Sequence, residues 1–349
     1  MRLGLNLGYL TAGDATGPVR LALQAEELGF SCVWAAEAYG SDAVTLLSWI
    51  AARTQRIDVG SAILQIPART PAMTAMTAAT LDTLSRGRFR LGLGVSGPQV
   101  SEGWHGVRFD QPLARTREYV EVVRLALDRR TVVHQGEHFR LPLPGGPGKP
   151  LKLMLQPCRS DIPLYLAAVG PRNLELVGEI ADGWLGVFFA PEHAEVSMQP
   201  LRTGAARAGR TVADIDIAVN VPVVLGEDVE ACADQLRAYT ALYVGGMGSR
   251  AQNFYNALAG RLGFADAAAK IQDLYLDGRS RDAAAAVPRE LIDATALIGP
   301  EERIAERLHA YAGAGVTMLN VVPHARSEEE RSATLRTTAR LLADTGLGD

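Results

Sequence analysis

The sequence alternates strand-like and helix-like segments from its first residues to its last. The eight strand-like segments are residues 2–8, 31–37, 56–64, 87–95, 162–169, 183–189, 215–225 and 316–323. A strand followed by a helix returns the chain to the same edge of a sheet, so the repeated units imply parallel strands. Eight units can close into a barrel, and an open doubly wound sheet is the alternative. We predict the α/β class, as an (α/β)8 TIM barrel that forms a single domain over residues 1–349.

Two insertions interrupt this alternation. After the fourth strand, residues 131–144 read as a two-stranded hairpin that turns at Gly136, within an insertion of about residues 130–161. After the seventh strand, an alanine-rich helical insertion covers about residues 246–298. Loops at the carboxyl ends of barrel strands build the binding site in such folds. We expect the helical insertion and the loop 97–111 to cover the pocket.

Composition excludes several classes of function. The 39 acidic residues outnumber the 35 Lys and Arg residues, which argues against nucleic acid or an anionic membrane as the main partner. Cys32, Cys158 and Cys232 have neither metal-ligand nor redox spacing, as expected in a reducing compartment. The amino-terminal segment lacks a signal-peptide pattern, and no apolar run is long enough to span a bilayer. We predict a cytoplasmic protein that acts on a small molecule.

A His-x-x-x-His pattern occurs at His134 and His138. On a helix, this spacing would place both imidazoles on one face and favour a metal site. Gly136 predicts a hairpin here instead, where the spacing loses that meaning. We therefore expect no metal site.

Gly92, Gly94 and Gly97 follow the fourth strand with the Gly-x-Gly-x-x-Gly spacing of a dinucleotide-binding turn. That motif also needs a helix that begins at the third glycine. Two further glycines and Pro112 predict a delayed helix. The glycines therefore favour the end of a barrel strand where backbone passes close to a ligand, and a simple tight turn is the alternative.

Three other strand ends carry candidate site residues. Gly170, Pro171 and Arg172 predict a helix amino terminus that could hold a phosphate or carboxylate, with an ordinary strand-to-helix turn as the alternative. Glu37 and Tyr39 follow the second strand, where a carboxylate could act as acid or base, or else serve as a helix cap or ion-pair partner. Trp104 and His105 follow the fourth strand, where they could line a pocket or form a packed indole beside a surface imidazole.

The sequence resembles the luciferase-like oxidoreductases, and among them an actinobacterial branch that uses coenzyme F420, a deazaflavin. The segments that carry the resemblance cover most of the chain and are residues 29–43, 59–124, 132–142, 170–184 and 253–278. It implies a bacterial luciferase-like barrel, with the deazaflavin bound at the carboxyl-terminal mouth and a homodimeric assembly.

The resemblance also implies positions for the cofactor. A bulge in the third strand would carry a non-proline cis peptide, here between Ala62 and Ile63, that supports the ring from behind. The loop at Gly170 to Arg172 would hold the phosphate. The full set of implied cofactor residues is Gly60, Ser61, Ala62, Ile63, Ser96, Gly97, Gln99, Ala168, Val169, Gly170, Pro171, Arg172, Gly186 and Val187.

The chain departs from better-known members at two positions. A His commonly follows the acidic residue of the second strand, where this chain has Ala38. The sugar-phosphate dehydrogenases of the family carry a Glu near the position of Gly97. Both departures remove titratable groups from proton-transfer positions and argue against glucose 6-phosphate as substrate.

These observations lead to one function and two alternatives. We expect hydride transfer between C5 of F420 and a small organic substrate, with Glu37 as first candidate for proton transfer, followed by His105 and Tyr39. Tyr9, Trp104, Phe254 and Tyr255 would line the substrate pocket. An FMN-dependent monooxygenase on the same barrel, or a deazaflavin-binding protein without catalysis, are the alternatives.

Overall fold

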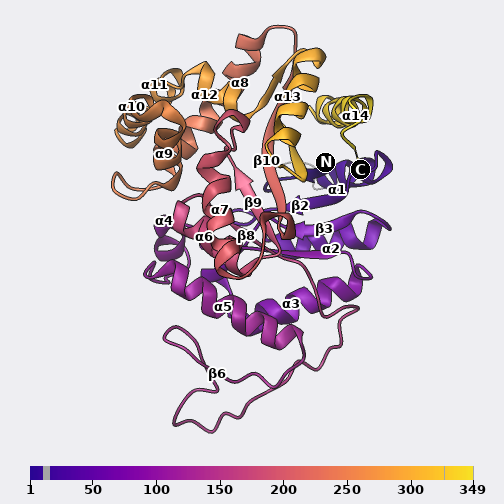
Figure 1. The fold of residues 1–349 in the computed structure, drawn as a ribbon, viewed down its shortest axis with the longest axis vertical. Helices are drawn as coiled ribbons and strands as arrows, with labels where there is room; N and C mark the ends of the chain where they lie inside the picture. The colour runs from indigo at the N-terminus through magenta and orange to yellow at the C-terminus, as the bar shows by residue number, and fades with distance from the viewer. Residues whose placement is uncertain (11–15, 326, 349) are drawn as a thin grey trace.

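The structure, a computed structural model, describes residues 1–10, 16–325 and 327–348. Within these residues, eight parallel strands close into a barrel, in which the last strand pairs with the first (Figure 1). In order around the barrel the strands are β1 (Arg2–Asn6), β2 (Cys32–Ala35), β3 (Asp58–Ser61), β5 (Phe89–Gly94), β8 (Leu164–Ala167), β9 (Gly183–Val187), β10 (Asp216–Leu225) and β12 (Met318–Pro323). The predicted barrel is confirmed, and closure excludes the open doubly wound sheet.

Helices surround the barrel and cover its strands. They are α1 (Gly17–Glu27), α2 (Ala43–Arg53), α3 (Pro71–Leu84), α5 (Pro112–Leu127), α6 (Pro171–Ile180), α7 (Glu195–Arg207), α8 (Val229–Ala241), α13 (Glu301–Gly313) and α14 (Glu328–Asp344). Short 3-10 turns are η1 (Ile66–Ala68), η2 (Pro191–His193) and η3 (Val212–Asp214). Thr70 caps α3 by accepting a hydrogen bond from the Met73 amide, and Pro71 occupies the first turn, where no donor is lost.

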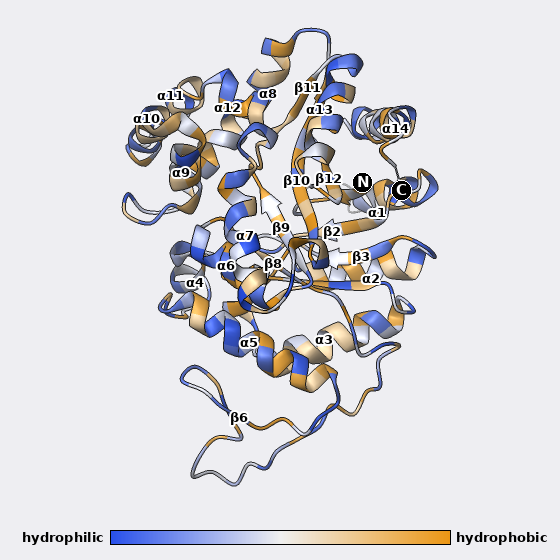
Figure 2. Ribbon diagram, viewed as in Figure 1, coloured by the Kyte–Doolittle hydropathy of each residue, from blue (hydrophilic) through white to orange (hydrophobic). Residues whose placement is uncertain are grey.

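Most of the hydrophobic core lies between the strands and these helices. Leu5, Val33, Val59 and Leu91 are fully buried there. Figure 2 shows the apolar strands inside and polar residues along the outer helices, as on α5. Burial on both faces explains why the strands read as nearly continuous apolar runs.

A smaller core fills the inside of the barrel. Its largest members are Trp34 and Tyr165, whose rings meet edge to face at 5.2 Å between centroids. At the amino-terminal end of the strands, Asp216 pairs with Arg2 at 2.7 Å and with Arg90 at 3.3 Å. Since the interior is packed, we look for the ligand site at the opposite, carboxyl-terminal mouth, where barrel enzymes have it.

The insertion after the fourth strand extends away from the barrel (Figure 1). Its predicted hairpin is present as β6 (His134–Gln135) and β7 (Arg140–Leu141), which pair antiparallel. The turn is closed by a hydrogen bond from the Gly136 amide to the Phe139 carbonyl at 2.9 Å. His134 and His138 therefore lie on a strand and a turn rather than on a helix.

The insertion after the seventh strand is helical for most of its length. It contains π-helical η4 (Leu242–Gly246), α9 (Phe254–Ala259), π-helical η5 (Gly260–Phe264), α10 (Ala265–Leu276), α11 (Ser280–Ala285) and α12 (Arg289–Thr295). The expectation of helix to residue 298 is wrong, because β11 (Leu297–Gly299) begins there and pairs with β10. Backbone pairing with an existing strand overrides the helical propensity of a short apolar run.

The segment after β5 also differs from expectation. A helix, α4 (Pro98–Gly103), begins directly after Gly97, so the predicted delay to Pro112 is wrong. Pro98 suits a first helical turn, and α4 ends after six residues at the next glycine. Within the described residues, no helix is long and apolar enough to cross a membrane.

Candidate active site at the barrel mouth

An apolar floor lies at the carboxyl-terminal end of the barrel interior. Half-buried Ala62, Ile63 and Ala167 pack on the interior core there. The peptide bond between Ala62 and Ile63 is cis, as the resemblance implied, and separates β3 from the two-residue strand β4 (Leu64–Gln65).

The glycines of β5 are required by close packing around this floor. A Cβ on Gly92 would lie 1.9 Å from the carbonyl oxygen of Ser61, and one on Gly94 would lie 2.8 Å from Cδ1 of Ile63. Ser61 and Gly92 are also joined by two hydrogen bonds of 2.9 Å. Gly97 has no such constraint, because its φ is −141° and its Cβ would meet nothing within 3.8 Å. The spacing of the three glycines thus reflects packing at two positions and not at the third.

Gly60 and Gly186 are both required by close packing against an indole. A Cβ on Gly60 would lie 2.3 Å from the indole of Trp34 on the neighbouring strand β2, inside the barrel. A Cβ on Gly186 would lie 2.8 Å from the indole of Trp184, two residues earlier on the same strand, in the core between strands and helices. Their implied contact with a cofactor stays a prediction.

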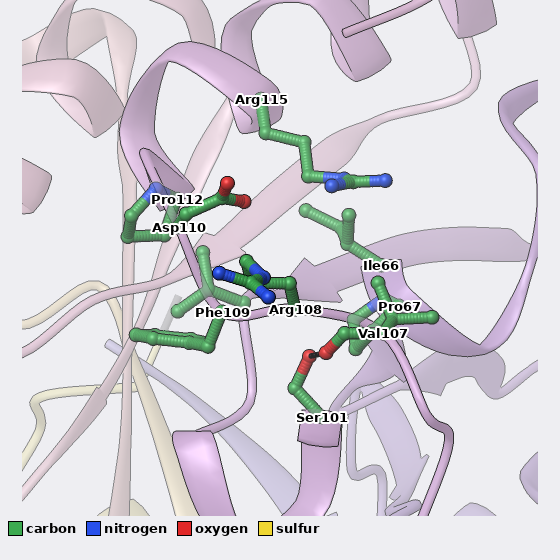
Figure 3. A pocket seen from close by; sticks show the side chains of 10 residues that line it. Ile66, Pro67, Ser101, Val107, Arg108, Phe109, Asp110, Pro112 and Arg115 are labelled. Atoms are coloured by element: carbon green, nitrogen blue, oxygen red, sulfur yellow. Dashed lines mark hydrogen bonds between the residues drawn. The ribbon is translucent and has the colours of Figure 1, made fainter.

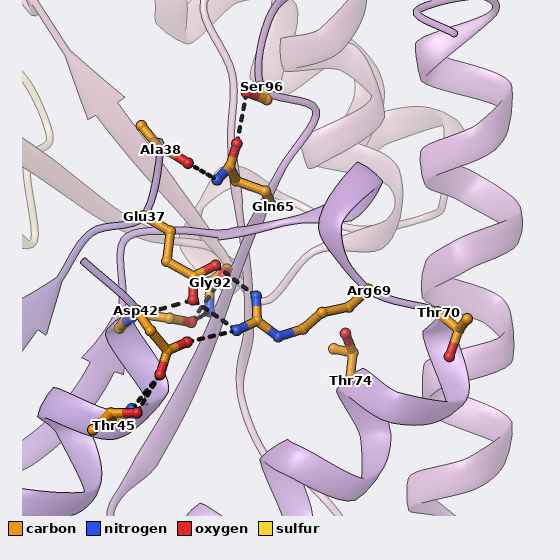
Figure 4. Close-up of polar contacts among 12 residues, drawn as sticks. Glu37, Ala38, Asp42, Thr45, Gln65, Arg69, Thr70, Thr74, Gly92 and Ser96 are labelled. Atoms are coloured by element: carbon orange, nitrogen blue, oxygen red, sulfur yellow. Dashed lines mark hydrogen bonds and ion pairs between the residues drawn. The ribbon is translucent and has the colours of Figure 1, made fainter. Parts of the chain in front are cut away.

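Glu37 is the centre of an ion-pair network beside the floor (Figure 4). Its two carboxylate oxygens accept hydrogen bonds from Arg69 at 2.6 and 2.7 Å, and one oxygen also accepts from the Ala43 amide at 3.2 Å. Arg69 also reaches Asp42, at 2.9 Å. The Glu37 side chain is only 6% exposed. Of the roles considered from sequence, the structure shows two: Glu37 is the ion-pair partner of Arg69, and it accepts a hydrogen bond from the first amide of α2 as a cap would.

A second contact set links three strand ends above this network (Figure 4). Buried Gln65 donates to the Ala38 carbonyl at 2.7 Å and accepts from the Ser96 hydroxyl at 2.9 Å. Ser96 has a positive φ of 61°, which turns the chain at the end of β5. The predicted residue Ser96 is therefore held in place at the mouth by Gln65, which the sequence analysis did not single out.

The turn between β8 and α6 lies across the mouth from Glu37's strand. Gly170 is the amino-terminal cap of α6 without a side-chain hydrogen bond, and Pro171 begins the helix. Arg172 is exposed in the first turn. Nη2 of Arg261, from η5, donates to the Val169 carbonyl at 3.0 Å. The predicted phosphate loop therefore has a second arginine close by, from a segment 92 residues away.

Aromatic side chains gather where the helical insertion meets the mouth. Phe188, which follows β9 with a φ of 51°, packs against the rings of Tyr239, Tyr243 and Tyr255 at 5.5 to 6.1 Å between centroids. Buried Asn253 fixes this arrangement, because it donates to the carbonyls of Tyr243 and Val244 and accepts from the Tyr255 amide. Burial raises the pKa of Tyr255 to about 12, so its hydroxyl stays protonated at neutral pH.

Tyr9 and His324 border this aromatic group. Burial, and then the proximity of Tyr243 and Tyr39, raise the pKa of Tyr9, yet 40% of the Tyr9 side chain is exposed. His324 follows β12, and its ring lies 6.3 Å from that of Tyr239. Burial lowers the pKa of His324, and Arg331 acts in the same direction. His324 is thus a largely neutral imidazole at neutral pH at the end of the eighth barrel strand.

The remaining predicted residues lie in separate segments, namely the loop after β5, the loop after β2 and the start of α9. Trp104 is 67% exposed, and Tyr39, which follows β2, is 61% exposed. Nε2 of His105 is buried without a hydrogen-bond partner among the described residues. Phe254 contacts Phe109, with 6.4 Å between ring centroids, so the helical insertion meets the loop 97–111, and their expected cover of the pocket stays a prediction.

A pocket of about 270 Å³ lies behind η1, beneath the loop that precedes α5 (Figure 3). Its lining includes Ile66, Pro67, Val107 and Phe109 but none of the predicted site residues. Because its lining residues differ, this pocket is distinct from the predicted ligand site.

A comparison with known protein families agrees with the fold and with the residues at the barrel mouth. A family model described as luciferase-like monooxygenase matches residues 5–318. The chain belongs to the luciferase-like monooxygenase family, which confirms the resemblance inferred from its sequence.

Individual relatives refine this placement. The chain is 43% identical to "Putative coenzyme F420-dependent oxidoreductase Rv3520c" of Mycobacterium tuberculosis over 338 residues, which are 95% of this chain and 97% of the relative. It is 27% identical over 296 residues to the 5,10-methylenetetrahydromethanopterin reductase of Archaeoglobus fulgidus, covering 84% of this chain and 86% of the relative. The structure of the F420-dependent tetrahydromethanopterin reductase of Methanopyrus kandleri superposes with a TM-score of 0.81 at 24% identity, over 98% of each chain, and supports the fold.

Proposed function

We propose that this protein is an oxidoreductase that uses coenzyme F420 to move a hydride to or from a small organic substrate. The observation that carries the proposal is the 43% identity, over 95% of the chain, to a protein named for F420-dependent oxidoreduction. The match leaves only 5% of this chain outside it.

The residues at the mouth fit such a cofactor. Half-buried Ala62, Ile63 and Ala167 form a floor for a flat ring. Arg172, Arg261 and the first turn of α6 place positive charge and backbone donors where an anionic tail would lie. When bound, F420 supplies or accepts a hydride at C5, and the protein orients the ring and excludes water.

Proton transfer must accompany hydride transfer in most reductions of this kind. Both oxygens of Glu37 are engaged by Arg69, so we propose that Glu37 shapes the mouth and that the proton comes from elsewhere. Tyr39 and His105 stay candidates from sequence. The protonated hydroxyls of Tyr9 and Tyr255 favour hydrogen bonds to a substrate oxygen, beside a floor suited to apolar substrates.

The direct test is binding of F420 to the purified protein by fluorescence quenching and calorimetry. We expect saturable binding of one cofactor per chain. Turnover of reduced F420 with a panel of enones, imines and aldehydes would then identify the acceptor class. Absence of F420 binding would refute the proposal.

The family description makes an FMN-dependent monooxygenase the second candidate. A flavin activates oxygen, whereas a deazaflavin does not. Yellow protein with copurified FMN and substrate-dependent oxygen uptake would favour this candidate. Binding of F420 without turnover of any acceptor would favour a carrier without catalysis.

We further propose that the protein is a homodimer in the cytoplasm. Trp49 on α2 and Met73 and Met76 on α3 are 40 to 52% exposed, and apolar side chains of this size favour an interface. The three cysteines are free, as expected in a reducing compartment. Light scattering at several concentrations tests the dimer, and a monomer throughout would contradict it.

A further inference from the structure

Arg261 ties the helical insertion to the loop that begins α6. It lies in η5, and its Nη2 donates to the Val169 carbonyl, one residue before the cap of α6. The contact joins residues 92 positions apart in the chain. The guanidinium is therefore positioned at the loop by the tertiary structure.

The charge of Arg261 has no counterion in the part of the chain that the structure describes. No carboxylate there lies within the 4.0 Å of an ion pair, although most other arginines of the insertion have one, such as Arg250 with Asp273. Nε of Arg261 is buried without a hydrogen-bond partner. Burial also lowers the pKa of this guanidinium. An unpaired, partly buried cation is costly unless an anion joins it.

Two other positive features lie at the same loop. Among the described residues no side chain caps the first turn of α6, so the backbone N–H groups of Arg172 and Asn173 are free to donate hydrogen bonds to an anion. Arg172 in that turn is exposed and makes no ion pair with any described residue. The loop thus combines a guanidinium from the insertion with donors from α6.

We propose that Arg261 is a specificity-determining residue that binds the phosphate of the cofactor tail and couples the helical insertion to cofactor binding. The proposal rests on the proposed function, because it assumes a cofactor of that shape at the mouth. It assigns to the insertion a part in selecting cofactors that carry a phosphate. Phosphate of F420 and phosphate of FMN share the chemistry, and the experiment distinguishes them.

The experiment measures the affinity of four ligands for the wild-type protein and for Arg261→Met. The ligands are F420, FO (the same deazaflavin with its ribityl chain but without phosphate and tail), FMN and riboflavin. Fluorescence quenching reports binding of each. We expect Arg261→Met to weaken F420 binding by about 10- to 100-fold while FO binding changes less than about twofold, as for loss of a charge-assisted hydrogen bond.

Two controls separate a phosphate contact from a structural role. Arg281→Gln removes an exposed charge of the same insertion and should leave all four affinities unchanged. Arg261→Lys keeps the charge but loses the bidentate geometry of the guanidinium, and should retain part of the preference for F420 over FO. In the wild-type protein, F420 but not FO should slow hydrogen exchange of residues 254–264.

Each alternative outcome would contradict the phosphate contact of Arg261, the use of F420, or both. Equal weakening of F420 and FO by Arg261→Met would show that Arg261 only holds the loop. Equal wild-type affinity for F420 and FO would show that the phosphate is not bound. Binding of FMN and riboflavin alone, with loss of only FMN in Arg261→Met, would refute the proposed use of F420 while supporting the phosphate contact. Binding of none of the four would refute both.

Discussion

Arg69 and Glu37 form a bidentate ion pair across the ends of neighbouring barrel strands. Nη1 of Arg69 donates to Oε2 of Glu37 at 2.6 Å, and Nη2 donates to Oε1 at 2.7 Å. The pair is mostly buried, at 17% and 6% side-chain exposure. It joins the turn before α2 to the turn before α3, and so holds one side of the mouth in shape.

Glu37→Gln should destabilise the protein more than it impairs proton transfer. Removal of one partner from a buried ion pair costs on the order of 3 kcal/mol. Urea unfolding should show this loss, and Asp42→Asn, at a 46% exposed partner, should cost less than about 1 kcal/mol. If Glu37 instead donates the proton, Glu37→Gln would abolish turnover while leaving stability near that of the wild type.

Gly92→Ala and Gly97→Ala should have opposite outcomes. A methyl at Gly92 would overlap the Ser61 carbonyl, and overpacking of this kind costs about 1–3 kcal/mol or more. At Gly97 there is space and an ordinary backbone conformation, so the free energy of unfolding should stay within about 0.5 kcal/mol. Thermal unfolding of both variants measures the difference. Similar losses would contradict the packing explanation of the glycine spacing.

Protonation of Asp216 in acid should lower the free energy of unfolding. Burial acts to raise the pKa of Asp216, but Arg2, the hydroxyls of Thr317 and Tyr165, and Arg90 outweigh it and hold that pKa below its ordinary value. A carboxyl with a lowered folded pKa contributes stability above its unfolded pKa of about 3.9, and that contribution is lost as pH falls through the folded pKa.

A comparison of the wild type with Asp216→Asn tests the direction of this pH dependence. The difference in unfolding free energy between the wild type and Asp216→Asn should be largest above about pH 4 and shrink below it. Glu306→Gln, at an exposed position on α13, serves as the control and should show little difference at any pH. A wild-type advantage that grows in acid would contradict the assignment.

His324 should titrate below the ordinary value for histidine. Burial is the main cause of its lowered pKa, and Arg331 adds to it. Arg331→Gln should therefore raise the pKa of His324 only in part. Proton NMR of the imidazole signals, assigned with His324→Asn, measures both values. A pKa at or above about 6.5 in the wild type would contradict the burial of this ring.

Much of the architecture was predictable because it depends on local sequence. Eight strand-helix units, the hairpin at Gly136 and the helical insertion all follow from periodicity and turn residues. The helix directly after Gly97 was not predicted, because only five residues separate Gly97 from Gly103 and their helical pattern is weak. The strand β11 was not predicted, because its pairing with β10 decides it. The contact of Gln65 with Ser96 has no local signal in the sequence. The Glu37–Arg69 pair has a weak one, because Arg69 follows the strand next to that of Glu37.

The sequence by itself determined the order and kind of the elements, because hydrophobic periodicity and turn chemistry act over a few residues. The sequence also identified the family, since the resemblance to luciferase-like oxidoreductases is confirmed. Only the tertiary structure decided that Glu37 is bound by Arg69, and that Arg261 reaches the turn into α6 without a carboxylate partner among the described residues. Barrel closure and the folding of the insertion bring such side chains together across tens of residues, where ion pairing and burial depend on distance in space rather than along the chain.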